Sequence, residues 1–430
     1  MNAGLDASTR WLSLLRRASS KQLGRALPDF SAQASAARDA ASKAALAPGG
    51  AVEQSLAQAF TASGLDPAHA PNLVGQLRNN VAQVDGHAVS PETLDAARAL
   101  APPEVNPQHT LILERTRGII ERLADISHGE RVERLKALRG RILVSTLPTG
   151  EINARAMRAP GDAGFVIVFE PAFFDFFYHF SNAFADAIDG PRAQALAQGH
   201  ALGEPDPPLA QAIRWGDSAP VKALSDTLCA FVFQGVPPPN LPAYRPDAFS
   251  LAEHLREGAM AFLMAHEYAH ILLGHLDGPA ASSFAASQAQ EIEADRLGWR
   301  MADTALARQG LPPPVRPMGA TLFLISALMV EMARGAALTG EPQTLTDRVR
   351  RAATETGGSH PTAVQRLAVL SEGLFSSYPP ELARGAQCFM ALLLEVAQQF
   401  WLRIGPVIQS RRAGGAQPSP VWEGWDAFAA

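Results

Sequence analysis

Residues 266–270 read His-Glu-Tyr-Ala-His, a pattern whose residue types and spacing can carry out chemistry. On a helix, side chains four positions apart lie one turn above the other, so the imidazoles of His266 and His270 can reach a single Zn²⁺. Glu267, next to the first histidine, can then reach a water molecule at the metal. The pattern is typical of zinc metalloproteases, and it predicts two metal ligands, His266 and His270, and a general base, Glu267.

A catalytic zinc has three protein ligands and one open position, so a second element must supply the third ligand. On the second of two predicted helices, Glu291 and Asp295 are four positions apart and share a face, whereas Glu293 points roughly the other way. Glu291 is therefore the predicted third ligand, and Asp295 is predicted to hydrogen-bond the free nitrogen of a ligating histidine. Capping boxes at the starts and glycines at the ends predict the two helices: Ser250/Glu253 to Gly274, and Ser287/Gln290 to Gly310.

Other interpretations of these residues are open to test. The His-Glu-His cluster can be buried with a purely structural role, and the acidic residues can form the solvated start of a helix. His275 is the rival third ligand, as in the metzincin pattern H-E-x-x-H-x-x-G-x-x-H. That pattern requires a glycine at Leu273 and a histidine at Leu276, so the register excludes it.

Composition narrows the classes of function. The chain has 430 residues, 47% hydrophobic and 18% charged, as expected of a globular protein with more than one domain. Its formal net charge of −5 gives no basic signature of a nucleic-acid partner. Cys229 and Cys388 cannot build a disulfide framework or a cysteine-rich zinc site, so histidines and carboxylates must hold any transition metal.

Targeting and membrane signals are sparse. The first 30 residues lack the pattern of a signal peptide, and no run of about 18 apolar residues occurs. The longest apolar stretch, 319–330, is predicted to be a buried helix, with a membrane-inserted segment as the alternative. Residues 10–25 have the character of a basic amphipathic helix that can contact a membrane surface or an acidic partner, although packing through its leucines is favoured. We therefore expect a cytoplasmic protein with no stable membrane contact, and the oligomeric state is left open.

The patterning predicts an α+β protein that is predominantly helical. Short β-rich runs at 142–146 and 165–169 predict a small sheet, and the aromatic run 173–184 predicts a core helix. Three regions follow: an Ala-rich helical N-terminal region at 1–105, a catalytic domain at 106–376 with a long Pro-rich insertion at about 202–248, and a C-terminal helix with a loose tail at 377–430.

Three motifs together resemble a known family. They are the run from His266 through His270 to Gly274-His275, the segment Glu291–Asp295, and Ser359-His360-Pro361-Thr362 with Arg366. In these motifs, the chain resembles the gluzincin zinc peptidases that include the CAAX prenyl proteases, HtpX and soluble periplasmic quality-control peptidases. A weaker match is Asn153–Ala156, ahead of the β-rich run. The resemblance covers about 150–376, and the membrane helices and signal peptide of those relatives are missing. A resemblance to a more distant cytoplasmic gluzincin clan, such as the phage-exclusion or regulator-cleaving peptidases, is the alternative.

The resemblance implies a zincin-like catalytic domain with one Zn²⁺ per chain and with His275 beside the ligands. It also implies a second donor for the oxyanion, for which His360 and Arg366 are the candidates. In the family, a strand along the cleft pairs with the substrate backbone. This implies five substrate-binding residues: Phe165, Val166, Ile167, Val168 and Phe169.

The sequence therefore predicts a zinc-dependent endopeptidase that hydrolyses a protein or peptide, with a metal-activated water and Glu267 as the base. The alternative is a zinc-stabilised protein-binding or chaperone-like protein with little turnover, for which the N-terminal region and the hydrophobic helix at 389–401 provide surfaces. A third hypothesis is regulatory: the Pro-rich segment, or the tail with Trp422 and Trp425, covers the cleft until it is displaced.

Overall fold

A computed structural model of the chain describes residues 3–25, 54, 83–84, 87–88, 105–125, 128–160, 164–188, 219–238, 248–277, 283–311, 313, 315–341, 344, 347–348 and 361–422. The chain divides into two compact units, residues 1–25 with 116–430 and residues 26–115. In the second unit, β1 (Gln83–Val84) and β2 (His87–Ala88) pair antiparallel. All three metal-site motifs of the sequence belong to the first unit.

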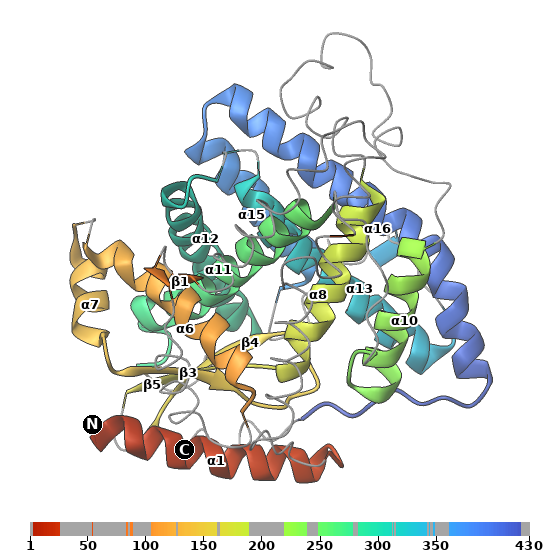
Figure 1. Cartoon of the computed structure of the whole chain (residues 1–430), viewed down its shortest axis with the longest axis horizontal. Helices are drawn as coiled ribbons and strands as arrows, with labels where there is room; N and C mark the ends of the chain where they lie inside the picture. Colours follow the sequence, from red (N-terminus) through yellow and green to blue (C-terminus); the bar gives the residue numbers. More distant parts are fainter. Residues whose placement is uncertain are drawn as a thin grey trace. The chain divides into compact units, whose positions relative to one another are not determined.

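A three-stranded sheet forms the β part of the first unit (Figure 1). The strands are β3 (Ile142–Thr146), β4 (Ala154–Arg158) and β5 (Phe165–Phe169), in the order β3-β5-β4. β5 is parallel to β3 and antiparallel to β4, with Ala156 opposite Ile167. All five residues of β5 are buried, as expected of a central strand. The predictions of strands at 142–146 and 165–169 are confirmed, and β4 is an additional edge strand.

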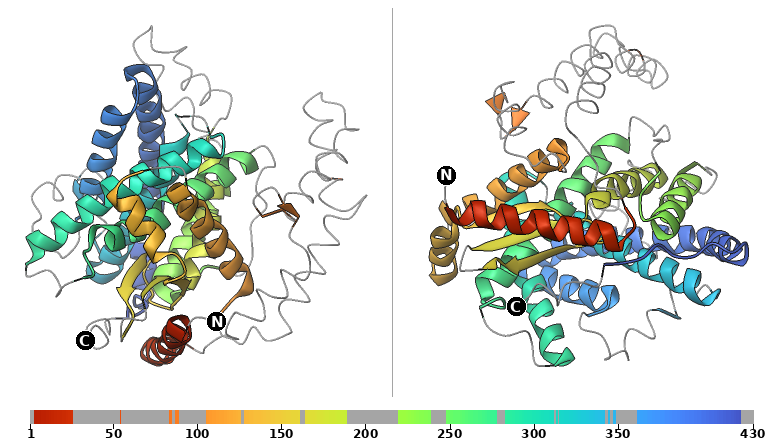
Figure 2. Two further views of the ribbon diagram at one scale, coloured as in Figure 1. Left: turned by 90° about the vertical axis from the view of Figure 1, so that its left-hand side faces the viewer. Right: turned by 90° about the horizontal axis from the view of Figure 1, so that it is seen from below.

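The two faces of the sheet pack against different elements. α1 (Ala3–Gln22) lies across one face, where Leu12 and Leu15 join Val166 and Val168 in an apolar cluster (Figure 2). Because side chains alternate along a strand, Phe169 points to the opposite face. There its ring contacts Phe173 at a centroid distance of 6.5 Å. The sheet therefore separates α1 from the helices that carry the metal-site motifs (Figure 1).

Helices make up most of the first unit, so the predicted fold class, α+β and predominantly helical, is confirmed. α13 passes through its core and is buried over most of its length, as predicted for 319–330. Among the described helices, only α13 is long and apolar enough to cross a membrane, and 72% of its most apolar stretch is buried inside the protein. The helices are α6 (Pro107–Glu121), the 3-10 helix η2 (Arg122–Asp125), α7 (Glu130–Leu138), α8 (Pro171–Ala187), α10 (Ala219–Gln234), α11 (Phe249–Leu273), α12 (Phe284–Arg308), α13 (Arg316–Thr339), α15 (Ala363–Ser377) and α16 (Pro380–Ala413).

The starts of the two motif-bearing helices differ from prediction. α11 begins at Phe249 without a side-chain cap, because its N-cap residue is Ala248, whose side chain cannot accept a hydrogen bond. Glu253 pairs with Arg256. α12 begins at Phe284, where the hydroxyl of Ser283 accepts a hydrogen bond from Ala286 N at 3.2 Å. The predicted end of α11 is confirmed: Gly274 has φ 77°, a left-handed conformation that favours glycine.

α1 and α16 both belong to the first unit. The predicted division at residues 105 and 377 stays a prediction. α1 packs on the sheet, and α16 packs against α13. The tail is not loose in its described part, because Trp422 is buried in the apolar cluster under the sheet and its N–H donates to Thr149 O at 2.8 Å. Trp422 therefore lies on the face away from the motif-bearing helices and does not cover them. Trp425 and most of the predicted Pro-rich insertion lie outside the described residues; within the insertion, 219–238 contains α10.

Candidate metal centre

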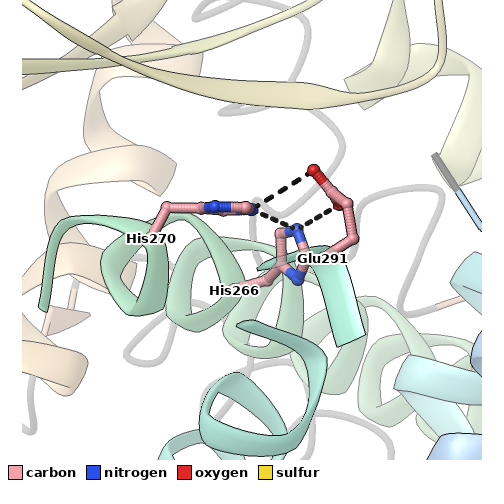
Figure 3. Close-up of side chains that lie close together, drawn as sticks. All are labelled: His266, His270 and Glu291. Carbon is pink, nitrogen blue, oxygen red and sulfur yellow. Dashed lines mark hydrogen bonds and ion pairs between the residues drawn. The ribbon is translucent and has the colours of Figure 1, made fainter. Parts of the chain in front are cut away.

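α11 brings two imidazoles together by its helical period. His266 and His270 are one turn apart, and their Nε2 atoms lie 3.2 Å from each other (Figure 3). His266 is 3% exposed and lies in the buried second half of α11. Burial of two polar rings without partners is unfavourable, so their surroundings must satisfy both nitrogens of each ring. The rings point toward α12, which supplies the third side chain.

Glu291 of α12 completes a group of three donor residues. Its Oε2 lies 3.3 Å from His266 Nε2, and its Oε1 lies 3.5 Å from His270 Nε2. One donor atom from each residue falls within 4.8 Å of the other two (Figure 3). Ligands at about 2.0–2.1 Å from one tetrahedral ion lie about 3.3–3.4 Å apart, so these separations fit a common metal ion. Two neutral imidazoles and one carboxylate also form a donor set that suits a transition metal.

A glycine sets the distance between the two helices. A Cβ atom added to Gly298 of α12 would lie 2.7 Å from His266 Cα and 2.8 Å from His266 N. Only glycine fits without moving α12 away from α11. The close approach places the side chain of Glu291, two turns earlier on α12, within reach of both histidines. The backbone contact at Gly298 is therefore part of the construction of the centre.

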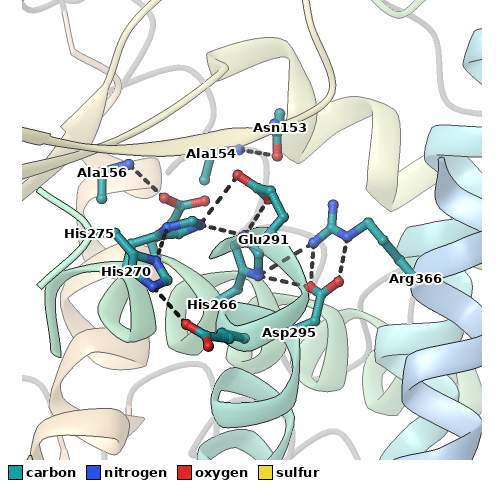
Figure 4. A network of polar contacts seen from close by, with 11 residues as sticks. Asn153, Ala154, Ala156, His266, His270, His275, Glu291, Asp295 and Arg366 are labelled. Atoms are coloured by element: carbon teal, nitrogen blue, oxygen red, sulfur yellow. Dashed lines mark hydrogen bonds and ion pairs between the residues drawn. The ribbon is translucent and has the colours of Figure 1, made fainter. Parts of the chain in front are cut away.

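A buried ion pair supports His266 on its other nitrogen. Asp295 Oδ1 lies 2.9 Å from His266 Nδ1, and both carboxylate oxygens accept hydrogen bonds from Arg366 of α15, at 2.6 and 2.8 Å (Figure 4). Burial alone raises the pKa of Asp295, but the charges of Arg366 and His266 lower it overall. Asp295 is therefore held as an anion. A carboxylate in this position fixes the tautomer that leaves Nε2 free for a metal.

The electrostatics of the centre favour positive charge. Burial by itself lowers the pKa of His266, but the charge of Asp295 and hydrogen bonds to Asp295 and Glu291 outweigh it and raise the pKa to about 10. A proton and a metal ion compete for the same ring nitrogens. Surroundings that stabilise a protonated imidazole at this position also stabilise a divalent cation between the three donor residues.

Glu267 lies between α11 and the edge strand of the sheet. Its side chain is buried at 4% exposure, and its Oε2 accepts a hydrogen bond from Ala156 N of β4 at 2.6 Å. Ala154 and Ala156 face α11 in the register of the sheet, and their small side chains let α11 approach β4. One oxygen of Glu267 is thereby fixed to the strand, and the carboxylate is oriented by the backbone.

The second nitrogen of His270 faces another histidine. His270 Nδ1 lies 3.0 Å from His275 Nδ1, and His275 Nε2 lies 3.3 Å from Glu293 Oε2 (Figure 4). Burial lowers the pKa of His275, and repulsion from His270 lowers it further against the attraction of Glu293 and Glu291. His275 is therefore neutral at pH 7 and keeps one ring nitrogen as a hydrogen-bond acceptor.

The structure brings seven of the predicted site residues into one cluster. These are His266, Glu267, His270, His275, Glu291, Asp295 and Arg366. His360 lies outside the described residues. Thr362 and Gln365 form the capping box that begins α15, the helix that carries Arg366.

The structure corrects the prediction of which strand binds the substrate. Residues 165–169 form β5, which is hydrogen-bonded to β3 on one side and to β4 on the other. A central strand has no free edge, so Phe165, Val166, Ile167, Val168 and Phe169 cannot add a peptide strand by backbone pairing. The sequence favoured β5 because it is the more apolar run, and burial on both faces is what makes a strand apolar.

Three contributions were missed by sequence reasoning. The N–H of Ala156 holds Glu267, Gly298 sets the spacing of the helices, and Glu293 binds His275. The match at Asn153–Ala156 was the one available signal for β4. A backbone N–H and a helix-to-helix contact have no residue-type signature, so the sequence offered none for the other roles.

Comparison with known proteins adds one finding. The sequence model of the family Peptidase U49 matches residues 233–377, about a third of the chain. The matched region contains α11, α12, α13 and α15, and therefore the three donor residues with Glu267, Asp295 and Arg366. No curated protein and no solved structure matches the chain. The match supports a peptidase activity on a protein or peptide substrate, and it falls on the helices that build the candidate metal centre.

Proposed function

We propose that the chain is a zinc-dependent endopeptidase that holds one Zn²⁺ through His266, His270 and Glu291. The observation that carries this proposal is the meeting of three donor atoms within 4.8 Å, from two helices, in the region similar to a peptidase family. Two histidines and one carboxylate are a ligand set of catalytic zinc, which keeps a position open for water or substrate. The bound metal would supply Lewis-acid polarisation of the scissile carbonyl and activation of a water molecule.

Glu267 is the proposed general base. Ala156 N fixes one of its oxygens at 2.6 Å, which leaves the other oxygen to accept a proton from the attacking water. The same carboxyl group then donates this proton to the leaving amine. The low exposure of Glu267 excludes competing solvent from the carboxylate. The strand that would bind the substrate thus also orients the base.

β4 is the proposed substrate-binding strand, in place of β5. It lies at the edge of the sheet, next to α11, and its partner on the other side is β5. Ala154 N is hydrogen-bonded to Asn153 Oδ1 at 2.9 Å, and Ala156 N is hydrogen-bonded to Glu267. Because the N–H and C=O of a residue point the same way in a strand, the carbonyls of both alanines also face outward. These carbonyls can accept hydrogen bonds from an extended peptide.

The second donor to the oxyanion remains assigned to His360 in this proposal. Two nitrogens of Arg366 bind Asp295, and Nη2 lies 3.4 Å from His266 Nδ1. Arg366 therefore acts through Asp295 and His266, as a positioning residue. We further propose a cytoplasmic location, because the chain's two cysteines, Cys229 and Cys388, are not joined to each other by a disulfide.

The test combines metal content with proteolysis. Zinc is measured by plasma mass spectrometry in the wild type and in His266→Ala, Glu291→Ala and Glu267→Gln, and cleavage of labelled casein and a peptide library is followed by mass spectrometry. We expect one zinc per chain, lost in the first two variants and kept in the third, with cleavage abolished in all three. Glu372→Gln, an exposed glutamate of α15, is the matched control and should cleave like the wild type.

The outcomes separate the hypotheses. Cleavage that survives Glu267→Gln in a clean preparation contradicts the assignment of the base. Zinc bound to His266, His270 and Glu291 without any cleavage supports the alternative of a zinc-stabilised binding protein. No zinc in any variant, after purification without chelators, removes the metal from the proposal.

A further inference from the structure

The two proposed ligand histidines have different partners at their Nδ1 atoms. His266 Nδ1 faces the carboxylate of Asp295, whereas His270 Nδ1 faces another imidazole, His275 Nδ1, at 3.0 Å. His270 Nε2 is 3.5 Å from Glu291 Oε1, so one nitrogen of this ring faces the donor group and the other faces His275. A ring with both nitrogens occupied in this way is fixed in direction.

The end of α11 places His275 at this position. Gly274 takes the left-handed conformation, and His275 N donates to His270 O at 3.0 Å, which turns the chain back along the helix. The His275 side chain is only 7% exposed. On its far side, Nε2 lies 3.3 Å from Glu293 Oε2, and the Glu293 side chain is 60% exposed.

The hydrogen-bond roles follow from the chemistry of imidazole. When His270 Nε2 binds a metal, its Nδ1 carries the hydrogen and must donate it. His275 Nδ1 is then the acceptor, so the hydrogen of a neutral His275 is on Nε2. That N–H donates to the carboxylate of Glu293. One set of tautomers therefore satisfies every contact of the chain His270–His275–Glu293.

We infer that His275 and Glu293 are positioning residues of the metal centre, and that they form one hydrogen-bonded chain from the ligand His270 to the protein surface. The chain holds the ring of His270 in the orientation and tautomer that bind the metal. This inference rests on the proposed function in that His270 is taken as a ligand. Of two glutamates two residues apart on α12, Glu291 thus contacts His270 directly, whereas Glu293 contacts it through His275.

The hydrogen-bonded series His270–His275–Glu293 differs from the contacts that support His266 in strength as well as in kind. Asp295 is a buried anion bound by Arg366, whereas His275 is a neutral acceptor and Glu293 is in contact with solvent. Loss of the contacts made by His275 should therefore weaken metal binding without unfolding the helices around the site. Glu293 occupies an exposed position where substitution is well tolerated, so the inference can be tested in a folded protein.

The experiment measures zinc affinity of the full chain by competition with a fluorescent chelator at fixed pH. We expect His275→Phe to weaken zinc binding by about tenfold to a hundredfold, the range for direct partners of ligating histidines. Glu293→Ala should have a smaller effect, about threefold to tenfold, because Glu293 acts through His275. Glu372→Gln, which removes a similarly exposed glutamate, should stay within about twofold of the wild type.

A double variant distinguishes a chain from two independent contacts. If His275 links Glu293 to His270, then Glu293→Ala should add nothing further in a His275→Phe background. The cobalt-substituted protein gives a second measurement. If His270 is reoriented, the visible absorption spectrum of the bound cobalt should shift in both single variants.

The results separate the inference from the proposed function. Wild-type affinity in both single variants, or fully additive losses in the double variant, would overturn the inference while leaving the zinc site intact. A wild-type chain that binds no zinc would overturn the proposed function and the inference with it. Should His275→Phe fail to fold, Glu293→Ala and the cobalt spectrum decide the question.

Discussion

The two faces of the three-stranded sheet pack against their helices through different kinds of interaction. On one face, α11 and α12 enclose a buried polar network in which His266, Asp295 and Arg366 depend on one another. On the other face, α1 and the tail pack through apolar side chains, among them Leu15 and Trp422. Charged groups in a low-dielectric interior are sensitive to geometry, whereas apolar burial is not directional. The first face therefore sets the precision of the site, and the second sets the stability of the strand behind it.

The face covered by α1 is mainly apolar, but it also contains polar contacts. Buried Arg16 of α1 donates a hydrogen bond to Thr146 O at 2.9 Å, and a polar junction lies at the loop between β3 and β4. Glu170 is buried and accepts hydrogen bonds from the N–H groups of Thr149 and Gly150, and its Oε1 lies 3.7 Å from Arg25 Nη1. Trp422 N donates to the carbonyl of Thr149. Arg25 and Trp422, far apart in the sequence, thus meet at the loop that leads into β4. The tail supports the proposed substrate strand from behind, which replaces the hypothesis that Trp422 covers the cleft.

The largest effect is expected where the polar network is broken. Arg366→Met leaves Asp295 buried without its cationic partner, and such a loss destabilises a protein by about 3–5 kcal/mol. Zinc affinity should fall by about tenfold or more, because Asp295 no longer holds His266. Chemical denaturation and chelator competition measure the two quantities. A folded variant with unchanged zinc affinity would show that the network does not position the ligand.

The matching change on the apolar face should affect stability alone. Trp422→Ala removes a side chain that is 2% exposed, which we expect to destabilise the protein by about 3 kcal/mol, the low end for a buried tryptophan. Zinc affinity should stay within about twofold of the wild type. Denaturation and zinc competition on the same preparation test this. A tenfold loss of zinc affinity would mean that the two faces are coupled and that the comparison fails.

The smallest expected change in stability comes from the contact between α11 and α12. Gly298→Ala forces a methyl group against the backbone of His266, at an expected loss of about 1–3 kcal/mol and about tenfold in zinc affinity. Gly335→Ala on α13 is the matched control, since a Cβ there meets nothing within 4 Å. It should stabilise the chain by about 0.5–1 kcal/mol and leave zinc binding unchanged. Equal behaviour of the two variants would contradict the role of Gly298.

Much of the candidate centre was accessible from spacing within single helices. The interval between His266 and His270, and that between Glu291 and Asp295, place each pair on one helix face whatever the rest of the chain does. The strands at 142–146 and 165–169 were also predicted from composition. The error concerned strand order: an apolar run predicts burial, and it does not tell which strand lies at the edge.

The sequence by itself determined the residue types of the centre, the helical period that groups them, and a helical fold with a small sheet. Tertiary structure alone decided that β4 lies at the edge of the sheet, that Ala156 N holds Glu267, and that His275 meets Glu293. The reason is physical. Local spacing follows from the geometry of one helix, whereas sheet order and the distance between helices follow from how segments far apart in the chain pack together, as at Gly298.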